Sequence, residues 1–174
     1  MISRFFFKIT LIETIKYLFI IFFFNKKSFE NDLKNKLLIY FNNSEFYFFD
    51  HGRTALYEIL CEIRKKTKKD KILVNSLTLF EVINAIIYSG FKPEFVDTKI
   101  NSFETNINLD NLNIDINEVA AILITHLNGA NKNIIELKKQ IDLHNINKEK
   151  IYLIEDCAVS LGSKINKKNV GSYR

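Results

Sequence analysis

Short apolar segments alternate with helical segments between residues 71 and 156, and this alternation constrains the fold more than any other feature of the chain. The expected strands lie at 71–74, 93–97, 119–124 and 151–154. The expected helices between them lie at 79–89 and 133–143. Strands that alternate with helices along a chain are typical of a parallel sheet with crossover helices. The sequence therefore predicts an α/β fold with a mainly parallel sheet and flanking helices.

The N-terminal part of the chain departs from this pattern. We expect a helical segment over 1–45, followed by a single domain over 46–174. Helices are predicted at 28–41 and 53–66, and the aromatic run at 46–49 predicts a short strand.

The segment 5–24 is strongly apolar and has the length of a membrane span. It contains Lys8, Glu13 and Lys16, and each charge near the centre of a span costs about 2.5–3.5 kcal/mol. On a helix these three side chains fall within about 140° of one another, which is typical of an amphipathic helix. We therefore expect a helix that packs against protein, with a membrane-surface helix and a true span as alternatives.

The composition excludes several classes of protein. Hydrophobic residues make up 47% of the chain, which is too many for a disordered protein. Cys61 and Cys157 are too few for a disulfide scaffold or a multi-thiolate zinc site, and they favour a reducing, cytoplasmic location. The net charge of +5 is modest and argues against nucleic acid as a partner. Because no spacing of metal ligands occurs, we expect no metal site.

One candidate binding segment precedes the helix expected at 53–66. Gly52 would let a ligand approach the backbone closely and would permit a tight turn. The N–H groups of a first helical turn bind anions, and the side chains of Arg53 and Thr54 could add donors. The segment is thus a candidate phosphate site, although Thr54 could instead be the cap of an ordinary turn.

Two further candidates follow strands, at the edge of the sheet where ligands bind in open α/β folds. Asp156 follows the strand at 151–154, and its carboxylate could hold a cation or a protonated ring nitrogen. Alternatively, it caps the next turn. Thr78 and Phe80 follow the strand at 71–74, and the ring of Phe80 could stack on a planar ligand or belong to the core.

His126 and Cys157 are weaker candidates. His126 follows a strand without an evident partner, which is usual for a structural histidine. Cys157 stands beside Asp156 without a neighbouring histidine that would support a thiolate nucleophile.

Five segments follow one another in a fixed order, namely GRTAL, LTLFEVINAI, SGFKPEFVD, AAILITHLNG and LIEDCAVSLGS. Together, over residues 46–172, they resemble the DegT/DnrJ/EryC1/StrS family of pyridoxal 5′-phosphate-dependent sugar aminotransferases. The resemblance implies a fold-type-I, aminotransferase-like large domain. It also implies a homodimeric enzyme that moves an amino group, from glutamate, onto a nucleotide-linked keto-sugar for surface polysaccharide.

The resemblance implies roles for individual residues. Gly52, Arg53 and Thr54 match the segment that holds the cofactor phosphate. Asp156 matches the carboxylate that pairs with the pyridinium nitrogen, and Thr78 matches the threonine of a threonine–aromatic pair whose ring stacks on the cofactor.

The sequence also departs from the family pattern. Leu79 stands where the family has its stacking aromatic ring, and Phe80, one position later, is the candidate substitute. Val159 stands where the family has Gln or His near the cofactor hydroxyl.

No catalytic residue is assigned, because the resemblance places the Schiff-base lysine beyond Arg174. Lys164, Lys167 and Lys168 come too early in the chain, and we expect them on a solvated hairpin. We therefore expect the N-terminal part of such an enzyme, truncated before this lysine, inactive in transamination on its own and weak in cofactor binding. The alternatives are a non-catalytic binding remnant and a membrane-surface protein that carries the α/β part as cargo.

Overall fold

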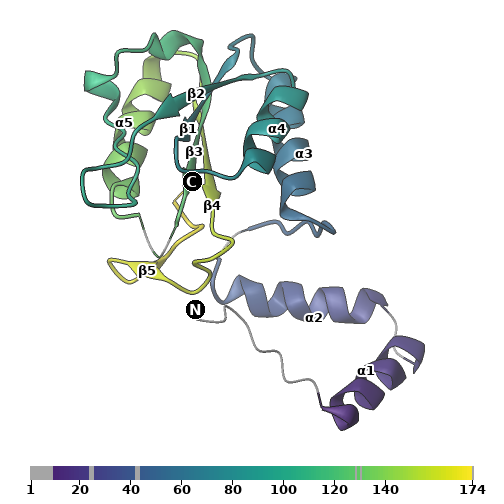
Figure 1. Cartoon of the computed structure of the whole chain (residues 1–174). Helices are drawn as coiled ribbons and strands as arrows, with labels where there is room; N and C mark the ends of the chain where they lie inside the picture. The colour runs from purple at the N-terminus through teal and green to yellow at the C-terminus, as the bar shows by residue number, and fades with distance from the viewer. Residues whose placement is uncertain (1–9, 24–25, 42–43, 128, 130, 174) are drawn as a thin grey trace. The chain divides into compact units, whose positions relative to one another are not determined.

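The computed structural model describes the chain except for residues 1–9, 24–25, 42–43, 128, 130 and 174 (Figure 1). The chain forms two compact units, Met1–Ser44 and Glu45–Arg174. The second unit contains the alternating strands and helices, and all the candidate site residues belong to it.

Four parallel strands form the sheet of the second unit, in the order β2-β1-β3-β4. Their bounds are Lys71–Asn75 for β1, Lys92–Val96 for β2, Val119–Thr125 for β3 and Tyr152–Asp156 for β4. Every residue of β3 is buried. This agrees with its continuous apolar sequence, because a central parallel strand is covered on both faces. The predicted α/β fold with a mainly parallel sheet is confirmed.

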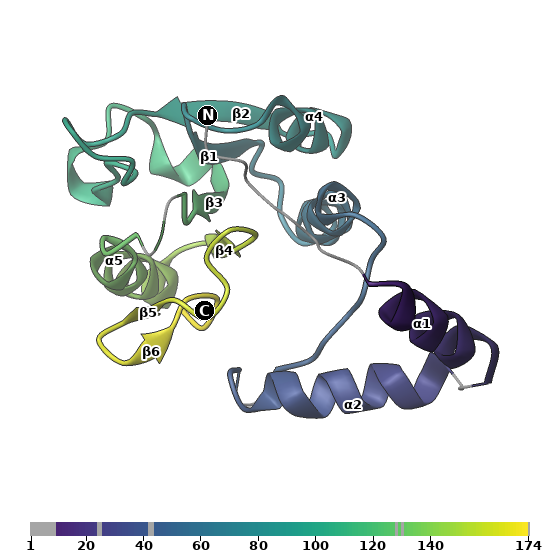
Figure 2. The same ribbon diagram turned by 60° about the horizontal axis from the view of Figure 1, so that its bottom comes forward.

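Helices cover both faces of this sheet (Figures 1 and 2). α3 (Gly52–Arg64) and α4 (Phe80–Tyr88) pack together on one face, and α5 (Ile134–Asn147) covers the other. Leu60 of α3 and Leu137 of α5 are buried in the two separate clusters of core side chains that result. Burial of each such side chain contributes about 1.5–3 kcal/mol, so the sheet is held from both sides.

The predicted hairpin near the C-terminal end of the described residues is confirmed. β5 (Lys164–Ile165) pairs with β6 (Lys168–Asn169) in antiparallel fashion. The two residues between them, Asn166 and Lys167, have φ angles of +48° and +67°. Two successive positive φ angles are typical of a type I′ turn, whose twist matches that of a hairpin. The three lysines of the hairpin are exposed.

The strand predicted at 46–49 is wrong, since residues 44–49 form no regular secondary structure. Aromatic residues favour strands mainly through packing and pairing with a neighbouring strand. Within the described ranges of the chain, no strand pairs with this segment, which enters α3 as irregular backbone.

The first unit contains α1 (Leu11–Phe23) and α2 (Lys26–Leu38). The backbone N–H of Thr10 donates to the Glu13 carboxylate at 2.8 Å, and the N–H of Glu13 donates to the Thr10 hydroxyl at 3.3 Å. This reciprocal pair is a capping box, which explains where α1 begins. Of the helices in the described residues, none combines the length and the apolar character needed to cross a membrane. The rest of the predicted helix, at 5–9 and at residue 24, lies outside the described residues.

Candidate functional site

A cavity of about 710 Å³, which we call the first cavity, lies where the carboxyl end of β4 meets the N-termini of α3 and α4. Three of the predicted site residues, Gly52, Arg53 and Asp156, line it together. Gly52 and Arg53 come from the start of α3, whereas Asp156 is the last residue of β4. The topology of a parallel sheet therefore brings two segments about a hundred residues apart to one side of the molecule.

The N-terminus of α3 is open toward a ligand. His51 precedes the helix in an extended conformation, and its side chain does not cap the helix. The N–H groups of Thr54 and Ala55 both donate to the His51 carbonyl oxygen at 3.1 Å. Among the described residues, no hydrogen-bond acceptor is found for the N–H groups of Gly52 and Arg53. These two donors and the helix dipole can bind an anion.

Gly52 leaves open space beside these donors. A Cβ atom added at Gly52 would meet no other atom within 4 Å. Gly52 is also absent from the glycines with a positive φ angle, so the turn itself does not require glycine here. The tight turn predicted for this position is therefore not the reason for the glycine, whereas close approach of a ligand is compatible with it.

Asp156 both caps a turn and offers a free acceptor. Its Oδ1 accepts a hydrogen bond from the N–H of Ala158 at 3.0 Å, which is the turn-capping role considered from the sequence. In the part of the chain that the structure describes, no donor reaches its second oxygen, Oδ2. The carboxylate therefore keeps one oxygen that can accept a hydrogen bond from a ligand in the first cavity.

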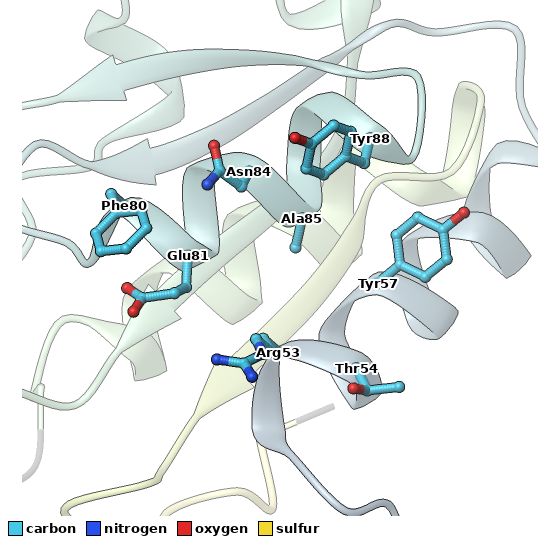
Figure 3. A pocket seen from close by; sticks show the side chains of 8 residues that line it. All are labelled: Arg53, Thr54, Tyr57, Phe80, Glu81, Asn84, Ala85 and Tyr88. Carbon is cyan, nitrogen blue, oxygen red and sulfur yellow. The ribbon is translucent and has the colours of Figure 1, made fainter.

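A second cavity, of about 720 Å³, lies between α3 and α4 (Figure 3). Side chains from α3 form one wall and side chains from α4 form the other, and the full set is Arg53, Thr54, Tyr57, Phe80, Glu81, Asn84, Ala85 and Tyr88. Arg53 and Glu81 line both cavities, so the two are neighbours. Thr54 lines only the second cavity.

Leu79 and Phe80 face different cavities. Leu79 is the extended residue before α4 and lines the first cavity with Asp156. Phe80 is the first residue of α4; it lines the second cavity and is 70% exposed. Thr78 is half-buried and lines neither of these two cavities. Of Leu79 and Phe80, only the leucine therefore shares a cavity with Asp156.

Glu155 is a residue of this region that the sequence analysis did not single out. Its side chain is buried, and its carboxylate accepts three hydrogen bonds. The donors are the ring Nε2 of His126 at 3.1 Å and the backbone N–H groups of Gly171 at 2.7 Å and Tyr173 at 2.6 Å. The signal that could have revealed it is the position of His126 and Glu155 at the carboxyl ends of two neighbouring parallel strands.

The prediction that His126 has no partner is wrong. The Asn131 N–H donates to its Nδ1 at 2.9 Å, so Nδ1 carries no proton and the neutral ring carries its proton on Nε2. Nε2 therefore donates to Glu155. His126 is completely buried, and both ring nitrogens are engaged, which is typical of a histidine that orders its surroundings.

Cys157 lies beside this pair. One potential ligand atom from each of His126, Glu155 and Cys157 lies within 4.8 Å of the others, although the sequence showed no such cluster. Burial and then the charge of Glu155 raise the pKa of the Cys157 thiol to about 12. A thiol with so high a pKa is a poor nucleophile and a poor metal ligand. Because the His126 nitrogens and the Glu155 oxygens already form hydrogen bonds, the cluster favours a structural role.

Comparison with known proteins gives a consistent result. The sequence profile described as "DegT/DnrJ/EryC1/StrS aminotransferase family" matches residues 25–174. GDP-perosamine synthase of Escherichia coli O157:H7 is 34% identical over 126 residues, which are 71% of this chain and 32% of that protein. GDP-perosamine synthase of Vibrio cholerae is 29% identical over 108 residues, which are 62% of this chain and 28% of that protein. The chain thus spans about a third of the length of these curated relatives.

A solved structure also resembles this chain. It is E. coli GDP-4-keto-6-deoxy-D-mannose-3-dehydratase with bound hydrated PLP, with a TM-score of 0.61 and 27% identity. The match covers 79% of this chain and 35% of that one. The predicted fold class, an α/β fold that forms part of an aminotransferase-like large domain, is confirmed.

Proposed function

The chain belongs to the DegT/DnrJ/EryC1/StrS aminotransferase family, and on this premise we propose that its first cavity is the pyridoxal 5′-phosphate site of an enzyme for nucleotide-linked keto-sugars. The observation that carries the proposal is the pairing of an anion-binding end, at Gly52 and Arg53, with a carboxylate end, at Asp156. Pyridoxal 5′-phosphate carries a phosphate group and a ring nitrogen. A site for it therefore needs an anion-binding end for the phosphate and a carboxylate for the protonated nitrogen. Amino transfer from glutamate, in the synthesis of surface polysaccharide, is part of the proposal.

The phosphate end would be held by the start of α3. The N–H groups of Gly52 and Arg53 would donate to the phosphate oxygens, and the Arg53 guanidinium would add positive charge. The Thr54 hydroxyl remains a proposed donor; it lines the neighbouring second cavity, so it would reach the phosphate from that side of Arg53, which lines both cavities. The missing side chain at Gly52 supports this assignment, because the space that a Cβ would take is open.

The ring end would be held by Asp156. Its Oδ2 would accept a hydrogen bond from the ring nitrogen while Oδ1 stays bonded to Ala158. A pyridine kept protonated in this way supplies an electron sink for the carbanion of the substrate. Leu79 would supply an apolar wall to the ring, and Thr78 and Phe80 remain proposed contacts.

The proposed partners are a nucleotide-linked keto-sugar, glutamate and a second copy of the chain. The names of the relatives, which are GDP-sugar enzymes, support a nucleotide-linked substrate. The second cavity supports the homodimer, because Phe80 and Tyr88 on its α4 wall are 70% and 76% exposed. Large aromatic side chains are enriched at protein interfaces.

Titration of the ¹⁵N-labelled chain with pyridoxine 5′-phosphate would test the cofactor site. This analogue keeps the phosphate and the ring but lacks the aldehyde, so it cannot react with surface lysines. We expect the amide signals of Gly52, Arg53 and Thr54 to shift with the analogue and not with pyridoxine, which lacks the phosphate. The Ala158 amide should shift with both. Shifts confined to other segments would contradict the proposal.

A further inference from the structure

The proposed enzyme function does not account for the surface of α1. This helix precedes residue 25, where the match to the family begins. Side chains spaced three and four residues apart form an apolar face, and each is at least half exposed: Leu11, Ile15, Leu18, Phe19 and Phe22. A helix face with this many exposed apolar side chains is typical of a surface that binds another protein or a membrane.

The charge of the chain is concentrated in the same unit. Residues 1–44 contain seven Lys and Arg against three Asp and Glu, which gives a net charge of +4. The whole chain has a net charge of +5, so the 130 residues that follow contribute only +1. A strongly apolar helix within a basic segment is complementary to an anionic, apolar surface.

The width of the apolar face distinguishes between possible occupants. With Ile12 included, these side chains span about 120° of the helix. Glu13, Thr14 and Lys16 lie outside this arc, and so do the further apolar residues of the helix, namely Tyr17, Ile20, Ile21 and Phe23. A seam that packs against one other helix is narrower, with two apolar positions in about seven. Phenylalanine and leucine on a wide face, with lysine at its border, are typical of a helix that lies in a membrane interface.

We propose that α1 docks on the surface of a membrane that contains anionic phospholipid. Its thirteen residues extend for about 20 Å, less than the hydrocarbon core of about 30 Å, so the helix would lie along the surface. The apolar face would enter the acyl boundary, while Lys16 and the basic residues of the unit would lie at the level of the phosphates. The inference stands independently of the proposed cofactor site.

Flotation of the full chain with phospholipid vesicles tests this proposal. We expect binding to vesicles with about 30% phosphatidylglycerol, and about tenfold less binding to pure phosphatidylcholine or in high salt. The variant that combines Ile15→Ser with Phe19→Ser should bind at least about tenfold less. The matched control combines Leu143→Ser with Ile146→Ser on α5, where both side chains are also exposed, and it should bind like the original chain.

Tryptophan fluorescence gives a second readout, which reports directly on whether α1 enters the membrane. The chain has no tryptophan, so Phe19→Trp introduces a single reporter on the apolar face. Its emission should shift to the blue on anionic vesicles, whereas that of Leu143→Trp should not. Failure of the full chain to float on anionic vesicles would overturn the proposal. If the Ile15 and Phe19 substitutions instead abolish a dimer in sedimentation, the occupant of the face is a second copy, which also overturns it.

Discussion

His126 donates a hydrogen bond from Nε2 to Glu155 over 3.1 Å, and this bond joins the carboxyl ends of β3 and β4 inside the protein. The same carboxylate accepts the backbone N–H groups of Gly171 and Tyr173. Glu155 thus ties the segment after the β5–β6 hairpin to the strand that carries Asp156. Glu155 therefore fixes the backbone around its neighbour Asp156, the residue proposed to hold the cofactor ring.

Replacement of Glu155 by alanine should destabilise the second unit. The change leaves the His126 ring and two backbone N–H groups without an acceptor in a buried place, which costs about 3 kcal/mol in the free energy of unfolding. Urea denaturation would measure this loss. Hydrogen exchange should speed up at the Gly171 and Tyr173 amides by more than it does in β1.

The control for this prediction is Glu136→Ala on α5. The Glu136 side chain is 68% exposed, and its removal should change stability by less than about 0.5 kcal/mol. An equal loss in the two variants would show that the three hydrogen bonds of Glu155 contribute nothing measurable.

Cys157 should react slowly with thiol reagents. Its pKa is raised to about 12, first by burial and then by the charge of Glu155, so the thiolate fraction stays very small at neutral pH. In a Cys61→Ser variant, the rate of alkylation by iodoacetamide should rise with pH without an inflection below about pH 10. An inflection at the pH of an ordinary cysteine would contradict the burial seen here.

The same alkylation assay tests whether the charge of Glu155 contributes to the raised pKa of Cys157. Glu155→Gln removes the nearby negative charge but keeps a side chain of the same size, so the pKa of Cys157 should fall and alkylation should become faster. Lys139→Gln on α5 changes charge at an exposed position and should leave the rate unchanged.

The sequence predicted the strands and helices well because the core residues follow clear patterns. Residues 119–124 are continuously apolar, and they form most of β3, in which every residue is buried. The strand predicted at 46–49 failed because aromatic residues need a pairing strand, which no local pattern reports. Hydrogen bonds between residues distant in the sequence could not be predicted either. His126 and Glu155, for example, are 29 residues apart.

The site could be predicted only in outline. Gly52, Arg53 and Asp156 lie at the ends of elements, where the rule for ligands in open sheets places a site, and they do share a cavity. Which of Leu79 and Phe80 faces that cavity depends on the residue at which α4 begins. A shift of one residue turns a side chain by about 100° on a helix, and the sequence does not define helix ends that finely.

Two glycines should respond differently to alanine. At Gly52 the space is open and φ is not positive, so Gly52→Ala should change stability by less than about 0.5 kcal/mol. Gly90, which ends α4, has a φ of +83°, and alanine there should cost about 1 kcal/mol. Thermal unfolding measures both. If Gly52→Ala also weakens the binding of pyridoxine 5′-phosphate, whereas Gly90→Ala does not, the open space serves the ligand.

Asp156→Asn separates the two roles of this side chain. Asparagine keeps an oxygen that can accept the Ala158 N–H, so the turn after β4 and the stability of the unit should be preserved. Asparagine carries no negative charge, however, and cannot stabilise a protonated ring nitrogen. We therefore expect the affinity for pyridoxine 5′-phosphate to fall about tenfold in the amide-shift titration. Asp110→Asn, at a side chain remote from both cavities, is the matched control. Unchanged affinity in Asp156→Asn would leave Asp156 with only its capping role and would remove the ring end of the proposed site.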